Sequence, residues 1–248
     1  MYKKHKVFIE PNYSDMLWRY LDFTKFMDLL ESESIFFTRA DKFEDKFEGS
    51  YSKLNRKIGR EVYKDMTDEQ YRTMINQVSF FSRNMIRYTF INCWHMNNYE
   101  SEAMWKLYSK SNEAVAIQTT YRRLKDCFNN YEKDIFIGKV NYIDYETEWM
   151  PEGNAFYPYV HKRKSFIHEN EVRAVMQELP CNEQGITFEK DICDYGINVP
   201  VDINILIENI YVSPLAPQWF GDLVKKVVNR YGYDKEVKFS KLNEQPIY

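Results

Sequence analysis

Residues 18–49, WRYLDFTKFMDLLESESIFFTRADKFEDKFEG, contain two predicted strands joined by a predicted helix and followed by a charged loop. Residues 17–21 are short and aromatic, which is typical of a buried strand. Residues 35–38, IFFT, are β-branched or aromatic and predict a second strand. Between them, apolar residues spaced i, i+3, i+4 and i+7 predict a helix with one apolar face that packs on a sheet: Phe23, Phe26, Met27 and Leu30.

The segment after the second strand, residues 39–49, alternates charged side chains with two aromatic ones and ends at Gly49. One interpretation is a solvated loop that Phe43 and Phe47 anchor to the core. The other is the rim of a pocket, because binding residues concentrate on loops that a rigid scaffold holds in place.

The remaining chain continues to mix both kinds of element, with no repeat and no linker-like tract. It predicts one α+β domain over residues 1–248, with mixed or antiparallel sheets flanked by helices. The further strands are expected at 89–95, 114–119, 135–145, 171–176, 196–201, 205–213 and 237–240, and the further helices at 51–87, 101–109, 121–128 and 219–231.

Composition excludes several classes of protein. Of the 248 residues, 44% are hydrophobic and 17% aromatic, which argues against disorder. A net charge of −3 gives no global attraction to nucleic acid or membrane. Because there is neither a signal peptide nor an apolar run of about 20 residues, we expect a cytoplasmic protein without membrane contact.

Two further patterns concern a basic segment and the cysteines. Residues 53–64, KLNRKIGREVYK, are basic and form either a solvated helix face or a patch for nucleic acid or another anion. The cysteines lack CxxC spacing and zinc-ligand spacing with the histidines, so we expect reduced, mostly buried thiols and no metal site: Cys93, Cys127, Cys181 and Cys193.

The most suggestive short motif is Glu169-Asn170-Glu171-Val172-Arg173. In an extended chain Glu169, Glu171 and Arg173 share one side. Neighbouring carboxylates raise one another's pKa, and the arginine lowers the pKa of both. The motif can stabilise a developing cation or hold a sugar hydroxyl, and it can equally be a structural ion-pair network.

Four blocks together resemble a bacterial family, domain of unknown function 2971 (DUF2971). They are WRYLDF…IFFTRADKFEDKFEG, INCWHMNNYESEAMWKLYS with AVAIQT, KRKSFIHENEVRAVM, and IENIYVSPLAP. The resemblance runs from about residue 18 to 240 and keeps the order of the blocks.

The order of parts is also similar to the ADP-ribosyltransferase fold. That resemblance implies that Arg19 holds the ribose or amide of NAD, that Thr38 shapes the nicotinamide pocket, and that Glu171 is the catalytic carboxylate. Glu169 matches the first glutamate of the ExE variant, and Tyr20 lies near the place where some members carry histidine.

Cleavage of the nicotinamide–ribose bond builds positive charge on the sugar. Such a site needs a fixed carboxylate, cations for the pyrophosphate and an aromatic wall for nicotinamide. With NAD as the substrate, Glu171 is the carboxylate, and the other expected contacts are Arg19, Arg39 and Arg173 as cations and Trp94, Trp105 or Tyr108 as the wall.

Three functions therefore remain open. The first is an NAD-dependent ADP-ribosyltransferase or NAD-glycohydrolase, with a protein or nucleic-acid acceptor and, by resemblance, a role as a toxin or phage-defence effector. The second is a non-catalytic module that binds a nucleotide or a protein. The third is a metal-dependent nuclease whose carboxylates hold Mg²⁺: Asp45, Glu48, Glu169 and Glu171.

Overall fold

The predicted strand–helix–strand unit is present at the start of the fold. In the computed structural model, which describes residues 1–109, 111–183 and 185–247, it comprises β1 (Met16–Asp22), α1 (Phe23–Ser32) and β2 (Ser34–Arg39). Each of the three lies within a residue or two of its predicted bounds. The short 3₁₀ helix η1 (Ala40–Lys42) then begins the charged loop.

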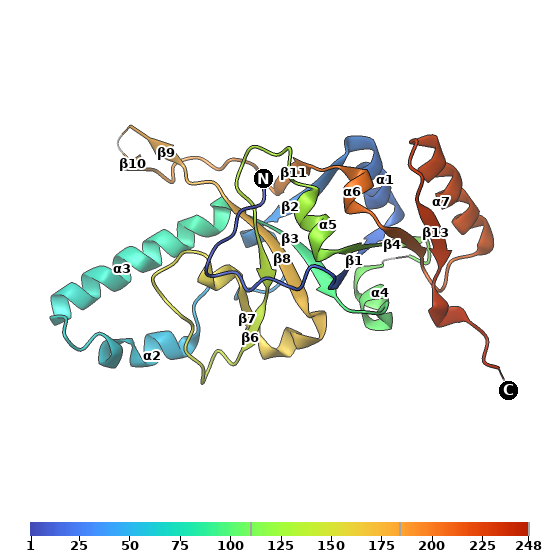
Figure 1. Ribbon diagram of the computed structural model, residues 1–248. Helices are drawn as coiled ribbons and strands as arrows, with labels where there is room; N and C mark the ends of the chain where they lie inside the picture. The colour runs from blue at the N-terminus through green and yellow to red at the C-terminus, as the bar shows by residue number, and fades with distance from the viewer. Residues whose placement is uncertain (110, 184, 248) are drawn as a thin grey trace.

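A mixed sheet organises the chain, and helices flank it (Figure 1). Within the described residues the strand order is β11-β2-β3-β1-β4-β12-β13, with β8 pairing β3 and β5 outside this path. The α+β class is therefore confirmed. The further strands of this sheet are β3 (Thr89–Met96), β4 (Ala114–Thr120), β5 (Phe136–Lys139), β8 (Glu171–Gln177), β11 (Gly196–Pro200), β12 (Asn209–Val212) and β13 (Glu236–Phe239).

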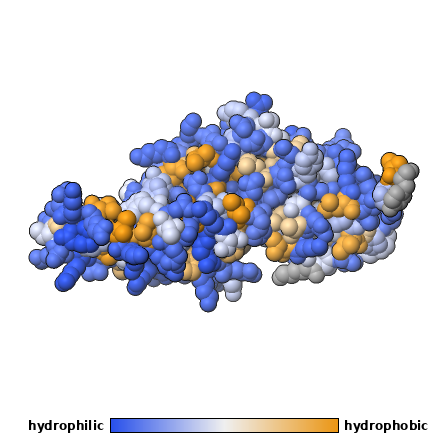
Figure 2. Space-filling model, turned by 90° about the horizontal axis from the view of Figure 1, so that it is seen from below, coloured by the Kyte–Doolittle hydropathy of each residue, from blue (hydrophilic) through white to orange (hydrophobic). Residues whose placement is uncertain are grey.

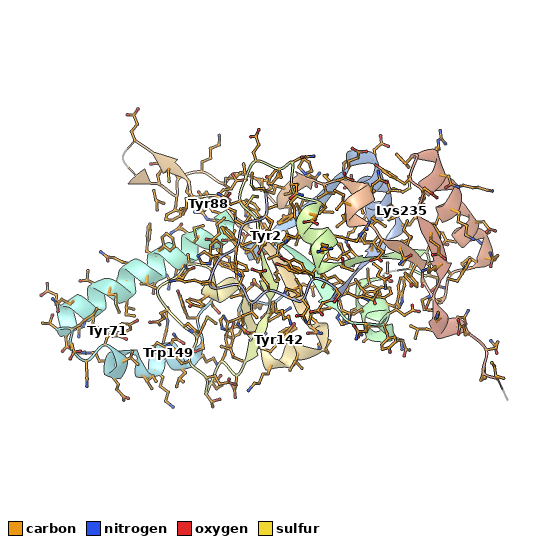
Figure 3. All side chains as sticks on the ribbon, in the orientation of Figure 1. Tyr2, Tyr71, Tyr88, Tyr142, Trp149 and Lys235 are labelled. Carbon is orange, nitrogen blue, oxygen red and sulfur yellow. The ribbon has the colours of Figure 1, made fainter. Side chains whose placement is uncertain are left out.

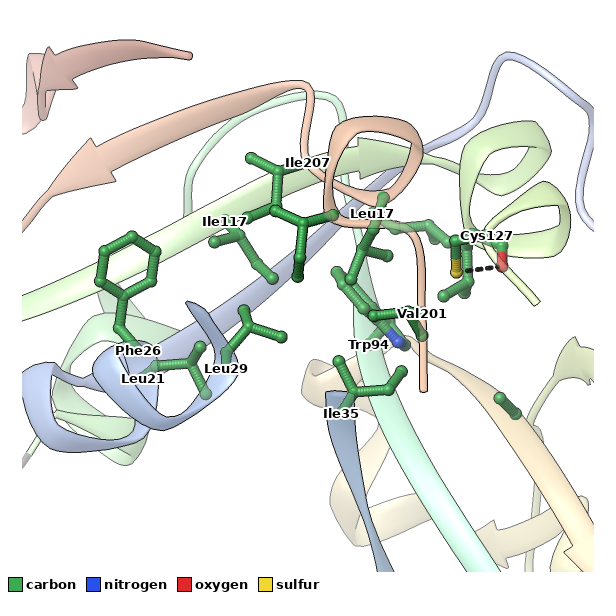
Figure 4. Close-up of a cluster of buried hydrophobic side chains, with 14 of the residues drawn as sticks. Leu17, Leu21, Phe26, Leu29, Ile35, Trp94, Ile117, Cys127, Val201 and Ile207 are labelled. Atoms are coloured by element: carbon green, nitrogen blue, oxygen red, sulfur yellow. Dashed lines mark hydrogen bonds between the residues drawn. The ribbon is translucent and has the colours of Figure 1, made fainter. Parts of the chain in front are cut away.

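The main core lies between one face of the sheet and four helices. Leu17 and Leu21 of β1 and Trp94 of β3 meet Phe26 and Leu29 of α1 there (Figure 4). The other helices that bury side chains in this cluster are α5 (Tyr121–Asp126), α6 (Ile203–Leu206) and α7 (Gln218–Arg230).

A smaller cluster covers the other side of β1. Trp18 and Tyr20 alternate with Leu17 and Leu21 and pack against Trp105 of α4 (Glu102–Tyr108). The period of two residues along β1 thus supplies both faces of the sheet.

Three predicted elements differ in their bounds. The expected strand at 135–145 is broken at Val140, because Asn141 no longer pairs with β8 and donates its backbone N–H to the carbonyl of Val160. Residues 141–143 form a separate strand, β6 (Asn141–Ile143). It pairs in parallel with β7 (His161–Arg163). The strand expected at 205–213 is shorter, since residues 203–206 form α6.

The third difference is a helical arm, which projects from the sheet (Figure 1). The helix expected over 51–87 is two helices, α2 (Lys53–Val62) and α3 (Asp68–Met85), because Thr67 starts a new helix with a capping box. Arg56 binds Ser79 of α3 and Arg60 binds Asp68, so these arginines of the basic segment hold the arm together.

The remaining short elements connect the larger ones. They are η2 (Ile86–Tyr88), η3 (Tyr157–Tyr159), η4 (Lys164–Glu169), η5 (Lys241–Asn243), and the hairpin of β9 (Cys181–Asn182) and β10 (Gly185–Ile186). Across the described part of the chain, we found no helix with the length and apolar character that crossing a bilayer requires.

Candidate functional site

The sheet is split along one edge of β3. β8 pairs with the other edge over residues 89–95. On the split edge, β1 pairs with β3 at His95 and Met96, and β2 pairs with β3 at Ile91 and Phe90. Residues 92–94 lie between these two pairings, so β1 and β2 diverge there.

Side chains take the place of the missing strand pairing at the split. Arg19 of β1 donates from Nη1 to the carbonyl of Cys93 at 2.7 Å. Asn92 donates from Nδ2 to the carbonyl of Phe36 of β2 at 2.9 Å. Backbone groups at the split are thus satisfied without closing the gap, which leaves room for a pocket.

A pocket of about 380 Å³ lies at the split, a size in the range of small-molecule sites. Its wall includes the Lys42–Asp45 part of the charged loop, which supports the interpretation of that loop as a pocket rim. Seven of the predicted site residues line this single pocket, although they come from six elements: Arg19, Tyr20, Thr38, Trp94, Tyr108, Glu169 and Glu171.

Three other predicted NAD contacts do not line the pocket. Arg39 is buried and bonds Asp41 at 2.6 Å and Asp191 at 2.9 Å, on the far side of β2. Trp105 lies beneath Tyr20, edge to face at 4.9 Å, and belongs to the core.

Arg173 is the third residue outside the pocket. It shares a face of β8 with Glu171, as alternation predicts, but its side chain is completely buried. It donates to Glu171 at 2.6 Å, to both oxygens of Glu48 at 2.7 and 2.9 Å, and to the carbonyl of Tyr159 at 2.8 Å. These contacts use its guanidinium inside the protein, so Arg173 supports the site from behind.

Glu171 is held from three sides. Its Oε2 accepts from Arg173 and its Oε1 accepts from Lys162 of β7 at 2.7 Å. Its backbone N–H donates to the hydroxyl of Tyr142 at 2.8 Å. Figure 3 labels Tyr142, which lies on β6. Lys162 also binds Glu169, so one ammonium bridges both glutamates of the motif.

The two glutamates differ in charge state. Burial, a hydrogen bond with Glu171 and the charge of Glu171 raise the pKa of Glu169 to about 8. Burial also acts to raise the pKa of Glu171, but Arg173, the bond with Glu169 and Lys162 outweigh it and hold that pKa below the usual range. Near neutral pH the pair therefore carries an ionised Glu171 beside a protonated Glu169.

Arg19 provides a cation at the opposite wall. Burial lowers the pKa of its guanidinium, whose carbon lies 6.0 Å from the centre of the Trp94 ring. Among the described residues it has no carboxylate partner, and its one hydrogen bond is to Cys93. A guanidinium with free donors at a pocket wall can bind a phosphate or a carbonyl group of a ligand.

The pocket residues that sequence reasoning missed include His95 and Lys162. His95 Nδ1 lies 2.6 Å from the carbonyl of Glu169, so Nδ1 carries the proton and Nε2 is left as an acceptor. Nε2 is buried and has no partner within residues 1–109, 111–183 and 185–247. The basic run HKRK at residues 161–164, in which Lys162 lies seven residues before Glu169, is the signal that could have identified Lys162.

Each of the four carboxylates of the nuclease hypothesis is paired with a cation, although Asp45, Glu169 and Glu171 line the same pocket. Asp45 pairs with Arg163, Glu48 with Arg173, and the other two with Lys162. The part of the chain that the structure describes contains no group of three or more His, Cys, Asp or Glu side chains that could hold a metal ion. The donor set thus does not fit a bound Mg²⁺.

Comparisons with protein-family models, with curated proteins and with solved structures gave no match to the chain.

Proposed function

We propose that the pocket at the split binds the nicotinamide-ribose half of NAD and cleaves the bond between them. The observation that carries this proposal is the convergence of seven residues, chosen for that chemistry, on one pocket. An ionised carboxylate, a cation without a carboxylate partner and an aromatic wall are the groups that the reaction requires. The proposal includes likeness to the ADP-ribosyltransferase fold and membership of DUF2971, on the resemblances of sequence given above.

In the proposed reaction, the bond between the nicotinamide nitrogen and ribose C1′ breaks, and its electron pair neutralises the pyridinium ring. The ribose becomes an oxocarbenium ion, which the fixed charge of Glu171 stabilises. His95 Nε2 accepts a hydrogen bond from a ribose hydroxyl. Water or an acceptor hydroxyl then attacks C1′ and releases its proton to bulk water, because Glu169 is already protonated near neutral pH.

The acceptor decides between hydrolysis and transfer. With water the products are nicotinamide and ADP-ribose, and with a protein or nucleic acid the product is a modified macromolecule. We place this activity in the cytoplasm, where NAD is present, and either outcome fits a toxin or phage-defence effector.

Nicotinamide release is the test. Purified protein is incubated with NAD alone and with NAD plus cell lysate, and nicotinamide is measured by mass spectrometry. We expect release by the wild type and a loss of at least about 100-fold in Glu171→Gln, which removes the charge that stabilises the transition state. The exposed Glu244→Gln is the matched control and keeps full activity.

A second candidate is a nucleotide-binding module without turnover. It is favoured by the ion pairs that occupy both oxygens of Glu171 in the structure. This candidate predicts that NAD raises the melting temperature while no nicotinamide forms, and such a result would reject the enzyme.

A further inference from the structure

A second pocket, of about 560 Å³, lies between the helical arm and residues 152–159. It shares no lining residue with the pocket at the split. Figure 2 views the molecule from below and shows apolar side chains among hydrophilic ones at the arm end of the surface. The walls are mainly aromatic and aliphatic, including Tyr51, Tyr63, Met74, Phe81, Met85 and Tyr159.

One carboxylate stands in this apolar wall. Glu152 is the single charged side chain among the described residues that line the pocket. Its Oε1 accepts from Asn55 Nδ2 at 2.8 Å, and its Oε2 accepts from the hydroxyl of Tyr63. Both partners are neutral, and the described residues give Glu152 no lysine, arginine or histidine to pair with.

Two hydrogen bonds place a donor against each oxygen of Glu152. The hydrogen bond to Glu152 is the largest of the effects that raise the pKa of the Tyr63 hydroxyl to about 12, so Tyr63 is the donor in this bond. Burial and the nearby charge of Glu152 also raise the pKa of Tyr51. Each carboxylate oxygen retains lone pairs for a further donor.

These features point to the charge and shape of a ligand. A carboxylate without a cation attracts a positive group, and the faces of aromatic rings attract cations as well. The apolar remainder of the wall favours a hydrocarbon body over a metal ion or a polyamine. An anion would be repelled by Glu152, and a neutral ligand would leave its charge uncompensated.

We infer that this pocket is a binding site for a small organic cation, an ammonium group on an aromatic or alkyl body, with the ammonium against Glu152. The site is independent of the proposed reaction with NAD, because the two pockets have separate walls.

The test uses three probes that share a phenyl body and differ in charge: 2-phenylethylamine, 2-phenylethanol and 3-phenylpropionate. Binding to the full chain is measured by isothermal titration calorimetry near pH 7. We expect the amine to bind at least about tenfold more tightly than the alcohol, as a charge-assisted hydrogen bond implies, and the carboxylate not to bind. Equal binding of amine and carboxylate, or no binding of the amine, would overturn the inference.

Two variants locate the site. Glu152→Gln keeps an oxygen for Asn55 and removes the charge, so we expect amine affinity to fall at least about tenfold. Ser82→Trp places a bulky side chain in the pocket from α3 and leaves Glu152 unchanged. It is expected to lower the affinity for the amine as well, so it tests the same site if Glu152→Gln does not fold. Glu244→Gln makes the same charge change far from the pocket and keeps the affinity. Undiminished binding in a folded Glu152→Gln or Ser82→Trp protein contradicts the assignment.

Discussion

Two residues of β8, Glu171 and Arg173, form the centre of a network of ion pairs behind the pocket, with Glu48 and Lys162 as partners. Glu169 lies in the 3₁₀ helix η4, so the expected alternation does not extend to it. Alternation along an extended chain correctly predicted that Glu171 and Arg173 share a face. It could not predict Glu48 or Lys162 as their partners, because these come from a distant loop and from β7. Pairing between remote segments depends on the fold and has no local pattern.

Arg173→Met tests how much this network contributes to stability. Loss of the guanidinium leaves Glu48 without its cation and Glu171 with Lys162 alone, both in a buried place. We predict a loss of about 3–5 kcal/mol in the free energy of unfolding, measured by urea denaturation. The exposed Arg83→Met serves as control and changes it by less than about 0.5 kcal/mol. A loss under about 1 kcal/mol for Arg173→Met would show that the network is not maintained in solution.

The raised pKa of Glu169 makes stability depend on pH. Between the ordinary pKa of about 4.5 and the folded value of about 8, the folded protein retains a proton at Glu169 that the unfolded chain has lost. The contribution of Glu169 to stability is therefore present below pH 4.5 and is lost as pH rises towards 8.

Glu169→Gln removes that dependence while keeping an oxygen for Lys162. We predict that the free energy of unfolding of this variant, relative to wild type, increases steadily from pH 5 to pH 8. Urea denaturation at four pH values measures it. A constant difference between variant and wild type over this range would mean that Glu169 titrates normally.

At the scale of elements, hydrophobic period predicted most strands and helices. The unit 18–49, the strand at 89–95 and the strand at 171–176 are found within a residue or two of their expected bounds. The break at Val140 was not predicted, because it depends on a hydrogen bond from Asn141 to the carbonyl of Val160, 19 residues further on. The turn before Thr67 was also missed, although the capping box of Thr67 and Gln70 is a local sequence pattern that marks a helix start.

α7 and β13 pack closely enough for one methyl group to matter. A Cβ at Gly221 would lie 2.2 Å from Cζ of Phe239. Alanine favours a helix over glycine by about 1 kcal/mol, but relief of this overlap requires the Phe239 ring or α7 to move. We predict that Gly221→Ala lowers the free energy of unfolding by about 1–2 kcal/mol, seen as a lower melting temperature. The exposed Lys226→Ala on the same helix is the control, and a melting temperature at or above wild type in Gly221→Ala would refute the packing.

For the whole molecule, the split in the sheet is the feature that brings residues distant in the sequence to one pocket. Arg19 and Glu171 are 152 residues apart in the sequence. They line one pocket with Thr38 because β1 and β2 share one edge of β3 and β8 pairs with the other edge. Sequence order suggested that these residues belong to one site, and they line one pocket. Sequence order did not show that Arg39 lies outside the pocket, because the position of its side chain depends on ion pairs with Asp41 and Asp191.

Nicotinamide release by two arginine variants tests the role of the pocket most directly. Arg19 lines the pocket, whereas Arg39 lies outside it, and the aspartates that pair with Arg39 also contact Arg87 and Lys42. The rate of nicotinamide release is measured per folded molecule at NAD concentrations below KM. We predict that Arg39→Gln releases nicotinamide at the wild-type rate. Arg19→Gln is slower by at least about tenfold, because it loses one charged hydrogen bond to NAD. No release by the wild type, or equal release by the two variants, would contradict an NAD site at the split.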